Sequence, residues 1–457
     1  MEVLAIKARS EWKTKAKKRK EKESDKGIVE LFFVIQHFFH GKLNDWIAEM
    51  TDPRHPSYTT YTQGDLICLG LLKNICAVET MRQMNEKFNE ETCIKTLALL
   101  SGHEGLEELP DYGTVNYYLE QLSPDCLSQL RRKMVAELIR SKVFNQNRLL
   151  NKYWIVVLDG TGLFHFKERH CENCLVREYT DEEGNQKKDY FHKVLEAKIL
   201  LADHLVISLG TEFIENENEE VSKQDCENAA AKRLMARLKK EYPRLPVCIL
   251  GDGLYCVEPL MGICRKNGWK YLLNLKEGTQ RNITKEFACL AEHGEGKQLQ
   301  NACAEKGRLR YYNHVEEIAD KKETFHVLEY EYSDVKGKHR FLWATNIKIR
   351  EGNAEELAKT GRKRWKIENE GFNNQKNGIY KIEHLNSRNS NAMKNHYLLT
   401  QIADILMQLY LATNKLVKSI GQSIKNTSSR LLESFRRQTI NEEDVLYIAR
   451  HTSVHLL

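Results

Sequence analysis

Two short apolar runs, each followed at once by an aspartate flanked by glycine, constrain this chain most strongly. The first run, Tyr153–Leu158, leads directly into Asp159 and Gly160. The second run, Val247–Leu250, leads into Gly251-Asp252-Gly253. Runs of this length and composition predict buried strands that end in tight turns. One Asp-Gly pair after a strand is an ordinary turn, but two such carboxylates at the edge of one sheet indicate a shared site.

The elements around these runs predict a mixed sheet. Strands are expected near residues 194–202 and 205–213, and a helix is expected over residues 225–242. A short helix near residues 257–267 then leads to a strand over residues 271–275. This order of strands and helices is typical of an α/β sheet with helices packed on its faces.

The other segments set the expected domain boundaries. Residues 28–150 carry helical patterns and predict an all-α N-terminal domain, whereas residues 278–343 are typical of a β-rich insertion. The predicted order is a basic N-terminal arm (1–27), the helical domain (28–150), a first core part (151–277), the insertion (278–343), a second core part (344–416) and a helical tail (417–457).

The charge of the chain is nearly balanced, at +6 from 70 Lys and Arg against 64 Asp and Glu, so net charge is weak evidence for a nucleic-acid partner. The basic run Lys15–Lys20 leaves two interpretations open, contact with DNA phosphates and a solvated tail. No apolar run approaches the ~20 residues of a membrane-spanning helix. The start lacks a signal-peptide pattern. We therefore expect a cytoplasmic protein with no membrane partner.

A third carboxylate is expected on a helix that begins near residue 354. Arg364 and Glu368 share one face of that helix, and a surface ion pair is the simplest interpretation of such a pair. Together with Asp159 and Asp252, however, Glu368 completes an oxygen-only ligand set that suits Mg²⁺, with Mn²⁺ as a substitute. A pair of such ions activates a water or a 3′-hydroxyl and stabilises the leaving oxygen.

These segments resemble bacterial insertion-sequence transposases of the DDE type. The resemblance is to the branch with a β-rich insertion between the second Asp and the Glu of a ribonuclease H-like core. The matching stretches are residues 157–162, 250–253 and 364–369, and the similarity extends over residues 60–415. The resemblance implies an α/β, mixed-sheet, ribonuclease H-like catalytic core. It also implies that Asp159 and Asp252 bind metal together with Glu368.

The resemblance further implies that the helical domain, residues 28–150, binds DNA, and it implies individual DNA-binding residues. Arg364 matches the Arg of the Y-x2-R-x3-E-x6-K signature, which contacts DNA phosphate near the cut end. The neighbouring Lys363 and Lys366 would add phosphate contacts.

The sequence departs from this signature at two positions. Gly361 occupies the Tyr position, and Gln375 occupies the Lys position. Lys376 comes one residue late, and on a regular helix it would miss the usual face. A one-residue bulge near Gly371 would restore that face, so Lys376 is a candidate DNA contact. Tyr380 is a candidate substitute for the missing tyrosine.

The resemblance implies metal-dependent cleavage of DNA at transposon ends, followed by attack of the freed 3′-hydroxyl on target DNA. The expected partner is double-stranded DNA, from the ends and the target, and the expected assembly is a dimer when two ends are synapsed. The protein would associate with the nucleoid. Two alternatives stay open. One is a catalytically inactive, transposase-derived DNA-binding protein, and the other is a metal-dependent nuclease without strand transfer.

Other polar residues each leave a choice. Cys171 and Cys174, with two His, could form a structural zinc site, but buried thiols are the favoured interpretation because the histidine spacing is not finger-like. Glu196 is either an acid that supports the metal ligands or, as we favour, a solvent-facing or paired strand residue.

Two further choices concern the acidic helix and a loop. Trp365 is either a base-stacking residue or, as we favour, part of the core. Glu370 is the alternative third carboxylate if the helix register is shifted. The acid-rich stretch at residues 215–220 is expected to be a solvated loop.

Overall fold

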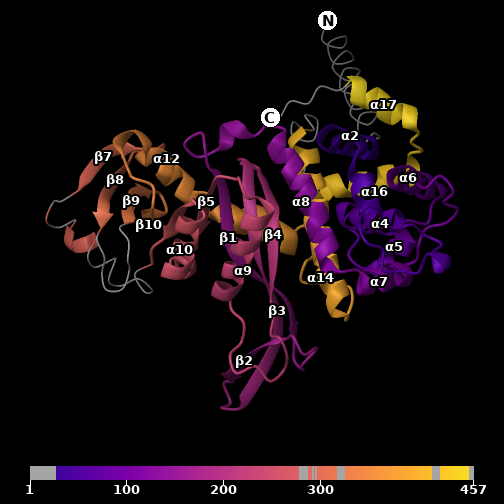
Figure 1. Cartoon of the computed structure of the whole chain (residues 1–457), viewed down its shortest axis with the longest axis horizontal. Coiled ribbons are helices and arrows are strands. Elements are labelled where there is room, and N and C mark those ends of the chain that lie inside the picture. Colours follow the sequence, from indigo (N-terminus) through magenta and orange to yellow (C-terminus); the bar gives the residue numbers. More distant parts are fainter. Residues whose placement is uncertain are drawn as a thin grey trace, which may run out of the picture. The chain divides into compact units, whose positions relative to one another are not determined.

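A computed structural model of the chain describes residues 27–276, 287–290, 293, 296–315, 325–413 and 423–451. The basic run Lys15–Lys20, with its two interpretations, lies outside these residues. The chain forms two compact units. One is the sheet unit, residues 139–374, and the other is the helical unit, which combines residues 1–138 with residues 375–457 (Figure 1).

The sheet unit is built on a mixed sheet whose described strands follow the order β2-β3-β1-β5-β6-β10-β9-β8-β7, with β4 paired to β3. The strands are β1 (Trp154–Phe166), β2 (Leu175–Thr180), β3 (Gln186–Ala202), β4 (Leu205–Ile214), β5 (Val247–Gly251), β6 (Lys270–Asn274), β7 (Lys297–Ala302), β8 (Gly307–Val315), β9 (Phe325–Asp334) and β10 (Gly337–Thr345). The pairs β1–β5 and β5–β6 are parallel. The first five residues of β1 and all of β5 are buried and apolar or glycine, as expected for strands covered on both faces.

Helices cover the two faces of this sheet. They are α9 (Glu227–Glu241), α10 (Glu258–Lys266), α12 (Glu351–Arg362) and the π-helical turn η4 (Ile367–Phe372), with 3-10 turns η2 (Asn145–Asn147) and η3 (Gly253–Tyr255). Helix α13 (Asn373–Asn377) follows η4 and spans the boundary between the two units. Ile155 and Val157 join Phe372 in the core under α12 and η4. Because successive residues of a strand face opposite sides of the sheet, Gly160 lies on the other face from Ile155 and Val157, beside Glu227 of α9.

Strand β1 is longer than the sequence predicts. The expected tight turn after Leu158 is wrong, because β3 stays hydrogen-bonded to β1 from Ile155 as far as Phe166. The parallel partner β5 pairs with β1 only up to Val157. Asp159 therefore lies where β1 loses its parallel neighbour and not in a turn.

The strands between residues 297 and 345 continue the same sheet. Strand β10 pairs with β6, with Trp343 opposite Asn274, and β9, β8 and β7 follow outward. The predicted β-rich stretch is thus joined edge to edge with the strands that precede it.

The helical unit contains helices throughout its described residues. They are α2 (Gly27–Phe39), α3 (Leu43–Ala48), α4 (Gln63–Ile75), α5 (Met81–Lys87), α6 (Glu91–Ser101), α7 (Tyr112–Gln121), α8 (Pro124–Arg140), α14 (Ser390–Thr413), α16 (Ile424–Arg437) and α17 (Glu442–His451), with the 3-10 turn η1 (Pro56–Tyr58). Helix α4 begins with a capping box, in which Thr62 and Asp65 each accept the other's backbone N–H.

The boundary between the two units differs from the sequence expectation. Residues 375–416 were expected in the second core part, but α14 packs against α2, α4 and α7. Its apolar residues, such as Leu398 and Ile402, are buried there. Helix α16, expected in a separate tail, packs against α2 and α6 of the same unit.

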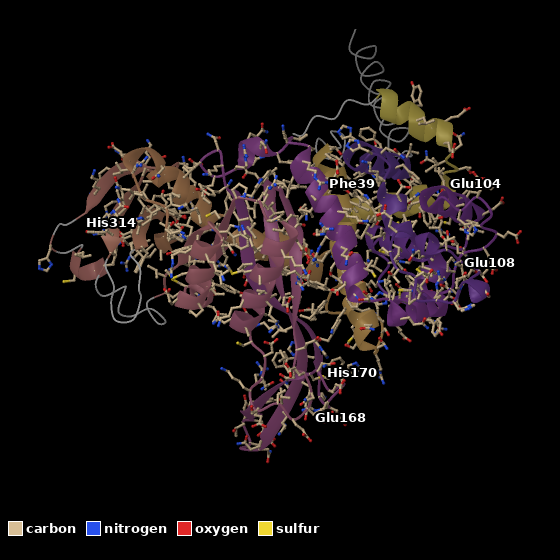
Figure 2. The ribbon with its side chains drawn as sticks, in the orientation of Figure 1. Phe39, Glu104, Glu108, Glu168, His170 and His314 are labelled. Atoms are coloured by element: carbon tan, nitrogen blue, oxygen red, sulfur yellow. The ribbon has the colours of Figure 1, made fainter. Side chains whose placement is uncertain are left out.

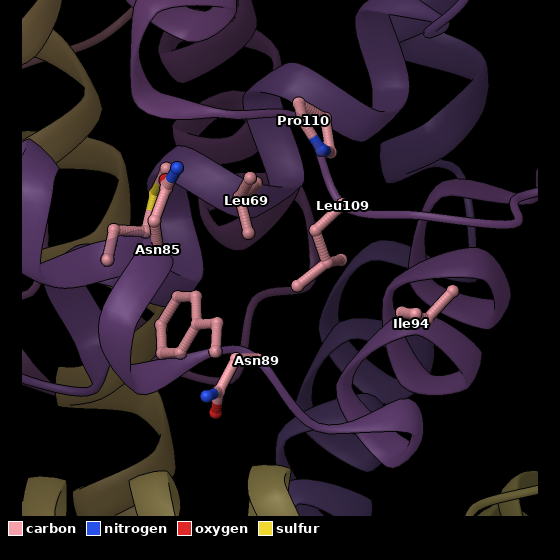
Figure 3. A pocket seen from close by; sticks show the side chains of 8 residues that line it. Leu69, Asn85, Asn89, Ile94, Leu109 and Pro110 are labelled. Atoms are coloured by element: carbon pink, nitrogen blue, oxygen red, sulfur yellow. The ribbon is translucent and has the colours of Figure 1, made fainter.

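Two further features of the described residues concern membrane contact and possible metal sites. Their helices include none with the length and apolar character needed to cross a membrane. The helical unit has a small cavity of about 160 Å³ beside Leu69, Asn85 and Pro110 (Figure 3). Its lining carries neither carboxylate nor thiol, so this cavity offers no metal ligand of the expected kind.

Candidate active site

The parallel register of β1 and β5 brings two aspartates to the same edge of the sheet. Val157 of β1 is paired with Leu250 of β5. Asp159 comes two residues after Val157, and Asp252 comes two residues after Leu250. Asp252 caps η3 by accepting the Leu254 N–H at 2.9 Å, and its second oxygen lies 2.8 Å from the Lys276 Nζ. The carboxylates are close enough for the charge of Asp252 to raise the pKa of Asp159.

Asp159 is the more perturbed of the two acids. Burial raises the pKa of Asp159 from its ordinary 3.8 to about 6, and the charges of Asp252 and Glu227 add to this rise. Arg364 and the Gly160 N–H, which donates to Asp159 at 3.0 Å, oppose the rise. Burial therefore disfavours the charged form of Asp159, the neighbouring acids add to this effect, and a bound cation would favour the charged form.

Arg364 lies between the first aspartate and the candidate glutamate. Its Nη1 is 3.7 Å from the Asp159 Oδ2, and its Nη2 is 3.9 Å from the Glu368 Oε2. The Arg364 guanidinium also stacks on the Trp365 ring at 4.5 Å, and its Nε is buried without a hydrogen-bond partner. The predicted Arg364–Glu368 pair is therefore present, as a loose ion pair rather than a tight hydrogen bond.

The helix segment that carries these residues is irregular. Helix α12 ends at Arg362, and η4 is π-helical over Ile367–Phe372, so the predicted bulge near Gly371 is confirmed. A π turn accommodates about one residue more than an α turn, which is the offset that a late Lys376 requires. Gly371 fits here because a β-carbon would lie 3.3 Å from the buried Lys198 side chain.

The glycine at position 361, where the signature has Tyr, has a structural cause in the sheet unit. A β-carbon on Gly361 would lie 2.5 Å from the Trp343 ring, which is fully buried. The indole from β10 therefore occupies the space into which a side chain at position 361 would extend.

The other departure has a cause in the helical unit. Gln375 is buried and donates to Gln401 at 3.0 Å and to Asp404 at 2.9 Å, so its role there is structural. Lys376 pairs with Glu383 at 2.7 Å. Tyr380 is buried in the same unit, where burial and then the Asp404 carboxylate raise its pKa. Tyr380 therefore offers no exposed hydroxyl in place of the missing tyrosine.

The lysines beside Arg364 are held by the turn between β3 and β4. Lys363 pairs with the Asp203 carboxylate at 3.1 Å, and Lys366 contacts the Asp203 carbonyl oxygen. Lys366 also holds the Glu370 carboxylate at 2.9 Å, whereas the Glu368 side chain is 52% exposed. Glu368 is thus the more available of the two glutamates.

The exposure of Trp365, Glu196 and residues 215–220 tests three expectations from the sequence. The preference for Trp365 in the core is wrong, because this side chain is 46% exposed at the surface beside Arg364. Glu196 does not face solvent; it is fully buried opposite Asp159 and accepts hydrogen bonds from Ser208, at 2.6 Å, and Thr211. The stretch at residues 215–220 is mostly exposed, as expected for a solvated loop.

Sequence reasoning missed one acid at this site. Glu227, in the first turn of α9, contacts Lys193 and accepts a hydrogen bond from the Tyr255 hydroxyl at 2.7 Å. A β-carbon on Gly160 would lie 2.6 Å from the Glu227 carboxyl carbon, so this glycine makes room for the acid. No local motif marks Glu227; only the packing of α9 on β3 and β4 brings it near Asp159.

The fold is thus a mixed α/β sheet in which Asp159 and Asp252 follow the paired segments of neighbouring parallel strands, with an Arg–Glu pair on a nearby helix segment. The family described as Transposase DDE domain matches residues 151–404, more than half of the chain, and the chain therefore belongs to this family. A solved piggyBac transposase, in a synaptic complex with hairpin DNA, is similar over 92% of this chain and 84% of that chain, with 8% identity and a TM-score of 0.41. No curated protein matches the chain.

Proposed function

We propose that this DDE transposase cleaves DNA at the ends of an insertion sequence and joins the freed 3′ ends to target DNA by in-line phosphoryl transfer. The sheet unit would be its ribonuclease H-like catalytic core. One observation carries the proposal. Asp159 and Asp252 follow neighbouring parallel strands in matched register, and Arg364 links Asp159 to Glu368.

The donor set fits a hard divalent cation. Asp159, Asp252 and Glu368 offer only carboxylate oxygens, which Mg²⁺ and Mn²⁺ accept. The raised pKa of Asp159 supports this fit, because burial and the neighbouring acids disfavour its negative charge, which a bound cation would offset. When bound, such ions supply charge stabilisation for the attacking and leaving oxygens.

The cationic side chains on the acidic helix segment would position the DNA backbone. Arg364 is nearly buried and preorganised, so it suits a phosphate close to the cut bond. Lys363 and Lys366 would exchange their contacts with Asp203 for phosphates. The exposed Trp365 ring would stack on a base, and Lys376 would add a further phosphate contact.

The substrate would be double-stranded DNA at both the transposon ends and the target. Joining two ends in one reaction calls for two active sites, so we propose a dimer in the synapsed complex. Because the substrate is chromosomal, the enzyme would act at the nucleoid, in the cytoplasm.

An end-joining assay tests this function. The full chain is incubated with labelled DNA that carries the ends flanking its gene, a target plasmid, and Mg²⁺. Transposition predicts nicked ends and labelled products covalently joined to the plasmid. Cleavage without joined products would replace the proposal with a nuclease, and binding without cleavage would replace it with an inactive DNA-binding protein.

A further inference from the structure

A second group of metal-ligating side chains lies on the sheet unit, outside the carboxylate site. The Sγ atoms of Cys171 and Cys174 are 3.6 Å apart, and each lies 3.4 Å from the Nε2 of His192. Among the described residues, this is the one group of three or more potential ligands whose donor atoms lie within 4.8 Å of one another. Cys174 and His192 are buried, and Cys171 is half-buried.

These distances match a tetrahedral metal site. With zinc–sulfur bonds of ~2.3 Å and zinc–nitrogen bonds of ~2.0 Å, tetrahedral geometry separates two sulfurs by about 3.8 Å and a sulfur from a nitrogen by about 3.5 Å. A disulfide would instead bring the sulfurs to about 2.05 Å. All three observed separations therefore correspond to ligands around a common centre.

The backbone builds this arrangement. The Cys174 N–H donates to the Cys171 carbonyl at 3.3 Å, and this turn directs both thiols to one side. Asn216 fixes the turn from the loop after β4, because its side-chain amide donates to the Cys174 carbonyl at 2.9 Å. His192 comes from β3, at the bulge where the β1–β3 register shifts between Gly162 and His165.

We propose that Cys171, Cys174 and His192 bind a structural zinc ion. Thiolate and imidazole are the ligands that zinc prefers, and a Cys-x2-Cys turn with a distant histidine is a common way to present them. The sequence alone favoured buried thiols, because nothing local linked His192 to the cysteines; the β2–β3 and β1–β3 pairings make that link.

The fourth position would be filled from outside this trio. His170 lies beside it, but its ring centroid is 6.4 Å from that of His192 and it stacks on Phe166 at 4.4 Å. Figure 2 labels His170 next to the β2–β3 ladder. A water ligand, or His170 after a side-chain rotation, would complete the proposed site.

The ion would cross-link the chain at the base of the β2–β3 ladder, which extends beyond the other strands of the sheet in Figure 1. It would join the β1–β2 loop to β3. The bulge beside His192 lies about 10 to 20 Å along β1 from Asp159, at about 3.3 Å per residue, so the zinc site is separate from the carboxylates. Its soft ligands also distinguish it chemically from an oxygen-only magnesium site.

Metal analysis of the full chain tests this site. The protein is produced without a histidine tag, purified without chelators and analysed by mass spectrometry for metals. We expect about one zinc ion per chain in the wild type and a loss of most of it in the Cys171→Ser/Cys174→Ser variant. Cys226→Ser, which removes an exposed thiol, should keep its zinc.

Cobalt substitution gives a second readout that does not depend on how the variants fold. Wild-type protein grown with Co²⁺ should show thiolate-to-cobalt charge transfer, which carboxylate ligands cannot give. Chelation of the zinc should accelerate hydrogen exchange in residues 167–193 and leave β5 unchanged. Wild-type protein with neither zinc nor the cobalt–thiolate band would overturn the proposal, as would full zinc in the double cysteine variant. Unchanged exchange in residues 167–193 would also overturn it.

Discussion

The guanidinium of Arg364 lies 3.7 Å from a carboxylate oxygen of Asp159. This contact links the irregular helix segment to the strand edge where the parallel pairing of β1 ends. Arg364 lowers the pKa of Asp159, yet burial and the neighbouring acids outweigh it. The net result is a carboxylate that the metal-free fold disfavours in its charged form, and this has a measurable consequence for stability.

The pH dependence of stability follows from that imbalance. The pKa of Asp159 is about 6 when folded against 3.8 in its ordinary range, so the folded protein binds more protons between these values. The free energy of unfolding should therefore fall as the pH rises from about 4 to 6. Asp159→Asn removes the charge and should stabilise the metal-free protein at pH 7.5, by about 1 to 3 kcal/mol, but not at pH 4. Urea unfolding in EDTA measures both.

Glu217→Gln is the control for that experiment, because it removes an exposed acid of the solvated loop. It should leave stability unchanged at both pH values. Equal destabilisation by Asp159→Asn at pH 4 and pH 7.5 would contradict the predicted charge imbalance.

The contact between Gly361 and Trp343 predicts a costly substitution. Gly361→Ala would force a β-carbon to within 2.5 Å of the buried indole, and overpacking of this kind costs about 1 to 3 kcal/mol. Gly352→Ala in the same helix α12 is the matched control, since a β-carbon added at Gly352 would meet no other atom within 4 Å. The control should be neutral or stabilising by up to ~1 kcal/mol. Thermal melts compare the two, and equal effects would argue against the predicted contact.

Gln375 and Lys376 should separate a structural role from a binding role. Gln375→Ala would leave Asp404 and Gln401 short of a buried partner and should destabilise the protein by about 1 to 3 kcal/mol.

Lys376→Ala should leave stability nearly unchanged but weaken binding of end DNA and reduce its salt dependence. Fluorescence anisotropy across a salt series measures this. A salt slope identical to that of the wild type would remove Lys376 from the DNA contacts.

The exposed ring of Trp365 makes a further prediction. Trp365→Ala should lower the free energy of unfolding by no more than about 1 kcal/mol, because the half-exposed ring gives up its stacking on Arg364. If the ring stacks on a base, the same variant should weaken end-DNA binding by about 1 to 3 kcal/mol. Tyr179→Ala, a similarly exposed aromatic on β2, is the control for general effects of surface truncation. Equal losses in both variants would contradict a specific role for Trp365.

Much of this arrangement could be predicted from the sequence because the signals are local. Apolar runs of six and four residues mark β1 and β5, and the helical period pairs Arg364 with Glu368. A bulge near Gly371 could be proposed from the sequence, because one extra residue in the helix would bring Lys376 to the face of the usual signature Lys, and the structure has a π turn there.

Features that depend on long-range packing could not be predicted in the same way. Glu227 approaches Asp159 only because α9 packs on the sheet, and Trp343 reaches Gly361 from a strand. Similarly, the amphipathic pattern of α14 shows that it must be buried but not against which partner, which is why residues 375–416 were assigned to the other unit.

The most direct test of the central claim is Mg²⁺-dependent cleavage of end DNA by wild type, Glu368→Gln and Glu370→Gln. Glu368 is half exposed beside Arg364, whereas Glu370 is held by Lys366. We predict that Glu368→Gln abolishes cleavage while folding and DNA binding persist, and that Glu370→Gln retains cleavage. Cleavage that survives Glu368→Gln but is lost in Glu370→Gln would contradict the proposed triad of Asp159, Asp252 and Glu368.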